Sequence, residues 1–190
     1  MANTGVNAVP QAGVIQGVIS LEGQKAAYMV AKTALALAAT PTVVASIQGS
    51  ATKTIKVRRV RISGAAATAS QNIPVELRKT STAFTGGTAT APTPVPVDSN
   101  LGAATAVVSY FTANPTEGTS VGAVASGVVP CLLATAAGAP GFGSNHHDLI
   151  DPYGEGITLR GTAQCLDVHL LGVTLNNTTT MNISFEFTEE

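Results

Sequence analysis

The chain has 190 residues, which suits one domain with or without an arm, and it is long enough to bury a sizeable core without disulfides. Charged residues make up 11% of it, less than half of the about 25% usual in soluble domains. The net charge of −1 excludes a general nucleic-acid binder, which needs a broad basic field. So few charges indicate that much of the surface faces other protein.

The N-terminal part of the chain predicts an arm followed by a folded domain. Residues 1–21 carry no charge and several glycines, so we expect an extended arm there and a folded domain over 22–190. The start of the arm lacks the basic region of a signal peptide. Residues 24–39 are alanine-rich, but they lack the amphipathic stripe of a surface helix, so we predict two short strands.

Residues 53–63 predict a strand with an irregularity. Ile55 and Val57 are apolar at odd positions, whereas Val60 and Ile62 are apolar at even positions. Side chains on a strand change face at every residue, so both pairs point inward only if one extra residue is inserted. We therefore predict a β-bulge near Arg58-Arg59.

Alternation of apolar and polar residues marks further strands, at 73–78 and at 181–188, each with one buried face. A second change of parity, between 166–170 and 171–175, predicts another long, bent strand. Prolines at every second position of 92–96 predict an extended surface segment that does not donate to a ladder. Residues 118–147 are free of charge, but glycines and prolines interrupt them too often for a membrane span.

Counted in this way, the sequence predicts roughly eight to ten short strands and no helices between them. The expected fold class is all-β, a jelly-roll-like β-sandwich with an extended N-terminal arm. The two cysteines, Cys131 and Cys165, are too few for a disulfide framework and lack metal-site spacing.

Several groups of residues are candidate sites, and each has a structural alternative. Cys165, Asp167 and His169 alternate along a strand, so they share a face that could bind a metal or hold a Cys-His pair, but a polar sheet face or a subunit contact is favoured. His146-His147-Asp148 lacks an evident third ligand. Glu155, between two glycines, lacks a partner acid and favours a turn. We expect no catalytic, cofactor or metal site.

The strongest candidate surface is the basic run that includes Lys53, Lys56, Arg58, Arg59 and Arg61. Such a run could contact phosphates. The alternation of apolar and basic residues instead favours a strand whose charges all lie on the face toward solvent or a partner. We therefore predict that Lys56, Arg58, Arg59 and Arg61 form a docking surface for an acidic protein partner.

Several segments resemble small structural proteins of tailed bacteriophages and prophages. They are residues 47–64, 74–79, 86–88, 96–98, 110–116 and 152–160, the last with a Gly-Glu-Gly turn. The resemblance covers roughly residues 42–190 and leaves the N-terminal arm unplaced. It implies a jelly-roll fold, a homotrimer, and attachment to the capsid or another part of the particle.

We therefore expect a capsid decoration, or cement, protein, synthesised in the host cytoplasm and located on the virion surface. Its partner would be the major capsid protein, with neither direct nucleic-acid binding nor a membrane. A carbohydrate- or receptor-binding module of a tail or fibre is the alternative, although the chain has no tryptophan and few other aromatics for a sugar platform. An enzyme using Cys165, Asp167 and His169 is a third hypothesis.

Overall fold

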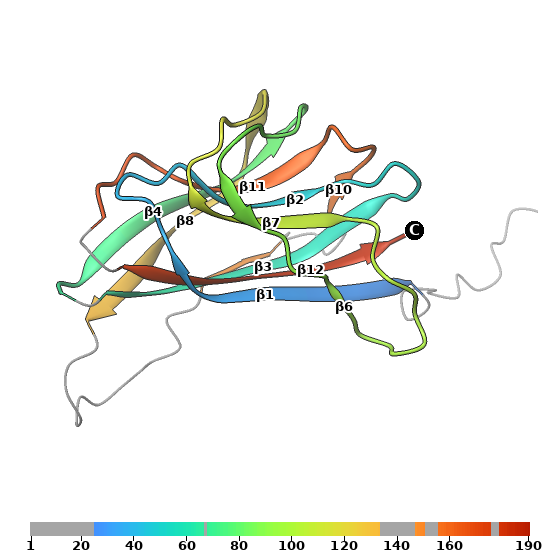
Figure 1. Ribbon diagram of the computed structural model, residues 1–190, viewed down its shortest axis with the longest axis horizontal. Coiled ribbons are helices and arrows are strands. Elements are labelled where there is room, and N and C mark those ends of the chain that lie inside the picture. The colour runs from blue at the N-terminus through green and yellow to red at the C-terminus, as the bar shows by residue number, and fades with distance from the viewer. Residues whose placement is uncertain (1–24, 67, 134–146, 151–155, 176–178) are drawn as a thin grey trace, which may run out of the picture.

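The computed structural model describes residues 25–66, 68–133, 147–150, 156–175 and 179–190, and within these ranges the chain forms strands and no helix (Figure 1). The all-β class is therefore confirmed. The strands are β1 (Ala26–Ala36), β2 (Val43–Gln48), β3 (Ile55–Ala66), β4 (Gln71–Thr80), β5 (Thr88–Thr90), β6 (Val95–Pro96), β7 (Val107–Ala113), β8 (Ser120–Leu133), β9 (His147–Ile150), β10 (Ile157–Leu159), β11 (Cys165–Leu170) and β12 (Thr180–Glu189).

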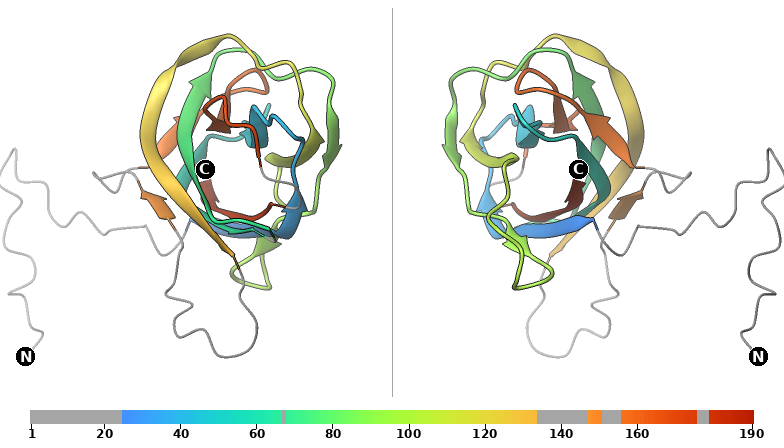
Figure 2. Two further views of the ribbon diagram at one scale, coloured as in Figure 1. Left: turned by 90° about the vertical axis from the view of Figure 1, so that its left-hand side faces the viewer. Right: turned by 90° about the vertical axis from the view of Figure 1, so that its right-hand side faces the viewer.

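The strands form one mixed, strongly curled sheet. Its order is β5-β7-β2-β11-β4-β8-β3-β12-β1-β6, with β9 and β10 paired to β3. Seen end-on, the sheet curves around an interior (Figure 2). The described pairs are antiparallel except β3 with β8, which run parallel over the short stretch from Gly64 to Ala66. This seam joins two parts of the sheet, β5-β7-β2-β11-β4-β8 and β3-β12-β1-β6.

The core lies between these two parts of the sheet. The predicted inward residues of β12 are all buried: Met181, Ile183, Phe185 and Phe187. Tyr110 of β7 faces Phe185 across the interior, with ring centroids 6.2 Å apart, and its hydroxyl donates to the Val30 carbonyl at 3.3 Å. Aromatic packing and this hydrogen bond therefore connect the two parts across the core.

The predicted bulge in β3 is confirmed. Glu186 of β12 lies opposite Arg59 and Phe187 lies opposite Val57, so Arg58 is the additional residue. Val57 and Val60 consequently both point into the core and are buried. The second parity change has another cause: β11 ends at Leu170, and Gly172 turns the chain with a φ of 58°. The prediction of a long, bent strand there is wrong.

Residues 24–39 also differ from the prediction. The described part, from Lys25 on, contains one strand, β1, rather than two. Its pairing with β12 is irregular between Lys32 and Leu35, where Ala34 adopts a φ of 49° and donates its N–H to Asn182 Oδ1 at 2.8 Å. The buried side chains Tyr28 and Val30 lie at even positions and Leu35 lies at an odd one, so the bulge keeps both sets inside. The alanines of this segment, which are apolar at both parities, obscure that change in the sequence.

The proline-rich segment runs over the surface as expected, but Val95 and Pro96 form the short strand β6 beside β1. The described residues thus hold more strands than the eight to ten predicted. The predicted arm, 1–21, lies outside the described residues, so its boundary stays a prediction. No described segment is a helix long and apolar enough to cross a bilayer.

Candidate functional site

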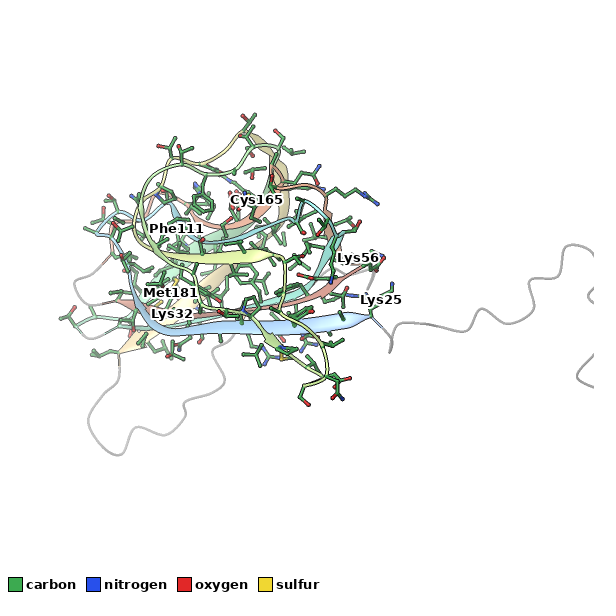
Figure 3. The ribbon with its side chains drawn as sticks, turned by 45° about the vertical axis from the view of Figure 1, so that its right-hand side comes forward. Lys25, Lys32, Lys56, Phe111, Cys165 and Met181 are labelled. Carbon is green, nitrogen blue, oxygen red and sulfur yellow. The ribbon has the colours of Figure 1, made fainter. Side chains whose placement is uncertain are left out.

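The basic run lies on β3 except for Lys53, which precedes the strand, and acidic residues on neighbouring segments lie close to several of its charges. Lys56 Nζ lies 3.1 Å from Glu190 Oε1, and Arg59 Nη1 lies 3.7 Å from Glu186 Oε2. Figure 3 shows Lys56 and Lys25 close to the end of β12, and Lys25 Nζ also contacts Glu190, at 2.7 Å. This end of the sheet therefore combines both signs of charge.

Arg61 forms a closer ion pair than Lys56 or Arg59 does. Its Nε donates to Asp148 Oδ1 at 2.8 Å, and this hydrogen bond raises the pKa of the guanidinium above its ordinary value. Asp148 belongs to β9, in which His147 is opposite Ile62 in the ladder, and His146 lies outside the described residues. The side chains of Arg59 and Arg61 are 41% and 46% exposed, so these pairs remain open to a partner and to salt.

A groove of about 550 Å³ lies beside these arginines. Its lining includes Met29 of β1, Val95 of β6, Glu186 of β12, and Arg59 and Arg61 of β3. Apolar side chains and paired charges thus meet in one depression on the outer side of the sheet. No pattern in the sequence predicts this groove, because β6 and β3 are far apart in sequence and are brought together only by their pairing with β1 and β12.

The three residues on β11 share a face, as predicted, but that face is not an open surface. Cys165 and Asp167 are fully buried, and the side chain of His169 is 12% exposed. Two covering segments lie over them: the first follows β4 and contains Thr85, and the second follows β7 and contains Thr116. Reciprocal backbone hydrogen bonds between Thr85 and Thr116 hold the two segments together. Phe84 of the first segment packs edge-on against Phe111, with ring centroids 4.7 Å apart. Figure 3 shows Cys165 and Phe111 on the same side of the molecule.

Charged residues surround this buried face at its His169 end. Glu117, on the covering segment, lies 3.4 Å from His169 Nε2 and 3.3 Å from Arg78 Nη1. Arg78 Nε also donates to Glu76 at 2.9 Å. Burial lowers the pKa of His169, and the Arg78 charge lowers it further, whereas Glu117 and Glu76 oppose the change. The imidazole is thus held close to a carboxylate in a partly desolvated site.

Asp167 is the least satisfied group of the cluster. Burial raises the pKa of its carboxyl to about 6, an effect that the neighbouring Ser46 hydroxyl lowers in part. Neither carboxyl oxygen has a hydrogen bond of normal geometry. The same is true of Ser46 Oγ, Thr80 Oγ1, Glu117 Oε1 and His169 Nδ1, so six of the seven such buried atoms in the described residues lie here. Such a concentration of unsatisfied groups is costly to the folded state.

This arrangement does not activate a nucleophile. Burial and the Asp167 charge raise the pKa of the Cys165 thiol to about 11, whereas a reactive cysteine needs a lowered pKa and access to solvent. Within the described ranges no three His, Cys, Asp or Glu side chains gather where they could hold a metal ion. Glu155 lies outside those ranges. The enzyme hypothesis therefore gains no support from the described residues.

A second surface that was not predicted is apolar and lies on β8. The exposed side chains are Val121, Val124, Val128 and Leu132, with 45–65% of each accessible to solvent. These residues lie in the charge-free run 118–147, and that lack of charge is the signal in the sequence that points to an apolar surface. Exposed apolar surface of this kind commonly marks an interaction site.

Comparisons with family models, with curated proteins and with solved structures found no match to this chain.

Proposed function

We propose that this chain is a structural virion protein, a jelly-roll decoration protein that forms trimers and binds the major capsid protein on the outside of a tailed-bacteriophage head. The observation that carries the proposal furthest is the order in which the strands pair. Composition and the phage-like segments support a role in a bacteriophage particle. The strand order supports the jelly-roll fold that such a role implies.

A jelly roll is wound from a long hairpin, so strands from the two ends of the chain lie next to each other. Here the first strand pairs with the last, β1 with β12, and the second pairs with the last but one, β2 with β11. The third strand returns to β12, and the fourth returns to β11. β8 continues the sheet beside β4, while β9 and β10 lie beside β3.

Two features depart from a plain jelly roll. The strands β5, β6 and β7 are inserted between β4 and β8 and extend both parts of the sheet at their edges. The parallel seam between β3 and β8 joins the two parts into one curled sheet. Neither feature changes the pairing of the first strands with the last ones.

A decoration role fits the surface better than glycan binding does. Sugar platforms use exposed aromatic rings, but five described aromatic side chains are buried and Phe84 is half-buried against Phe111. The buried ones are Tyr28, Tyr110, Phe111, Phe185 and Phe187. The surface offers instead exposed valines and paired charges, which suit contacts with other protein subunits.

The number of copies in purified particles tests this function. Quantitative mass spectrometry of virions should find hundreds of copies, in a fixed ratio to the major capsid protein. A few to a few dozen copies per particle would support the tail or fibre alternative. Absence from the particle would refute the proposal.

For the docking surface we retain the outer face of β3, with Lys56, Arg58, Arg59 and Arg61. The double variant Arg59→Ser, Arg61→Ser should fold normally, because exposed ion pairs contribute less than about 1 kcal/mol each. It should also show reduced occupancy on capsids, and wild-type docking should weaken as salt rises.

The exposed Arg160 offers a matched control for this experiment, because it lies after β10 rather than on β3. Arg160→Ser removes one positive charge and should leave capsid occupancy unchanged. If the double variant of β3 decorates capsids normally at every salt concentration, the outer face of β3 is not the docking surface. Val60→Asp, which places a charge in the core beneath the same strand, should abolish soluble protein.

A further inference from the structure

The exposed apolar side chains of this protein are concentrated in two places. Eight large hydrophobic side chains are exposed in the described residues, and seven of them fall into two groups. We call Val121, Val124, Val128 and Leu132 the β8 patch, and Met29, Val95 and Val97 the β6 patch. The remaining one, Val107, lies on β7 outside both groups.

The β8 patch follows an edge of the sheet. β8 pairs with β4 along most of its length, but with β3 only from Cys131 to Leu133. Its pairing with β4 is interrupted twice, which leaves Val124 and Val121 as additional residues opposite β4. Bulges of this kind, together with Pro130, hinder the addition of another strand to an edge. The β8 patch is therefore suited to contacts between side chains rather than to a backbone ladder.

The β6 patch belongs to a concave surface. Met29 and Val95 line the groove of about 550 Å³, and Val97 follows β6 at its rim, held by a hydrogen bond from its N–H to the Ala27 carbonyl at 2.8 Å. The groove has room for several aliphatic side chains. A ridge of valines and a groove with apolar walls are complementary in shape.

The two patches are also compatible in charge. β8 contains no charged residue. The arginines that line the groove, Arg59 and Arg61, already have Glu186 and Asp148 as partners. An apolar ridge can therefore enter the groove without removing the partner of either arginine, which would be the costly outcome.

Their positions favour a contact between unlike patches. Figure 2 shows β8 along one side of the curled sheet and β6 on a different side. A contact between two different patches is heterologous, and it forms a closed ring when the rotation between subunits permits. A copy of this chain carries both halves of such a contact, so a second copy is the occupant that the surface itself supplies.

We infer that the β8 patch of one copy packs into the β6 patch groove of the next copy, and that three such contacts close the ring. This inference rests on the trimer of the proposed function and adds the interface. The same substitution can be placed in each patch and outside both, which makes the interface testable by variants of equal chemistry.

The variants are Val128→Asp in the β8 patch, Val95→Asp in the β6 patch, and Val107→Asp as the control, since Val107 is as exposed as Val128. Light scattering should give a wild-type mass of three times 19.1 kDa, about 57 kDa, and the same mass for the control. Each patch variant alone should be a monomer. An equimolar mixture of the two should form a one-to-one heterodimer, because one intact contact can be built from their two unaltered patches.

Other outcomes separate the possible failures. If both patch variants remain trimers, the trimer stands and this interface is wrong. If only Val128→Asp dissociates and the mixture forms no heterodimer, the contact joins like patches and the ring proposed here is refuted. A monomeric wild type at high concentration refutes the trimer itself. Melting curves show whether each variant is folded. Val128→Thr or Val95→Thr, which keeps the shape of the side chain, replaces any aspartate variant that does not fold. These threonine variants should weaken the ring without abolishing it.

Discussion

The Asp167 carboxyl should make the stability of this protein fall as the pH rises from about 4 to about 6. Its pKa of about 6 in the folded protein compares with an ordinary value of 3.8. In this window the folded protein keeps a proton that the unfolded chain has lost, so raising the pH favours unfolding. The difference corresponds to about 3 kcal/mol of unfolding free energy, fully lost above about pH 6.

Replacing Asp167 with asparagine removes this titration and keeps the shape of the neutral side chain. Asp167→Asn should therefore be more stable than the wild type at pH 7.5, by up to about 3 kcal/mol, and about equal to it at pH 3.5. The other groups that face Asp167 are unchanged in the variant. They are Ser46 on β2, Arg78 and Thr80 on β4, Cys165 and His169 on β11, and Glu117 on the covering segment.

Urea denaturation at several pH values measures the effect, as the difference in unfolding free energy between the two proteins. Asp98→Asn, which removes an exposed carboxylate, controls for the change in net charge. A difference that is the same at every pH would refute the reasoning, because it would show that the substitution acts through packing. A variant less stable than the wild type at pH 7.5 would show that the carboxylate is better satisfied than the geometry indicates.

Three further predictions concern the seam, the thiols and the arm. A Cβ at Gly64 would clash with Cys131 Sγ but would lie 3.4 Å from Cys131 Cβ. Gly64→Ala should therefore lower the free energy of unfolding by about 1–3 kcal/mol in the wild type and by much less in a Cys131→Ala background. A double-mutant cycle measured by urea denaturation tests this difference. Burial raises the pKa of the Cys131 and Cys165 thiols to about 11, so a thiol reagent at pH 8 should modify them only on unfolding; modification without unfolding would contradict this. Deleting residues 1–21 should leave the melting temperature nearly unchanged and weaken binding to capsids, whereas an unfolded product would make the arm an integral part of the domain.

Local features of this fold were predictable from the sequence because they depend on alternation within one strand. The change of parity between Val57 and Val60 contained enough information to locate the bulge at Arg58. The alternation at the C-terminus likewise identified the inward face of β12. In both cases a strongly apolar set must point to one side, so a single register satisfies the pattern.

Features that depend on pairing across the sheet were not predictable. Cys165, Asp167 and His169 alternate as on any half-exposed strand, and only the segments from β4 and β7 that fold over them make their face buried. The acidic partners of Arg59 and Arg61 come from β12 and β9, which the sequence alone does not place beside β3. The exposed valines of β8 look like core residues in sequence, since exposure depends on what lies opposite.

The two proposed contacts differ in their chemistry, although Arg59 and Arg61, which line the groove, belong to both. Arg59 and Arg61 of β3 are partly exposed and paired, so docking through them would depend on ionic strength, because salt screens exposed charges over about 10 Å at 0.1 M. The contact between the β8 and β6 patches buries valines and should persist or strengthen as salt rises.

Raising the salt concentration should therefore release intact trimers from capsids. Sedimentation of decorated capsids at increasing salt, with the mass of the released protein measured by light scattering, tests both contacts at once. Release as monomers would place charge in the subunit contact, and capsids that stay decorated at high salt would place apolar surface in the docking contact. Either result would require exchanging the roles assigned to the basic face of β3 and the apolar patches.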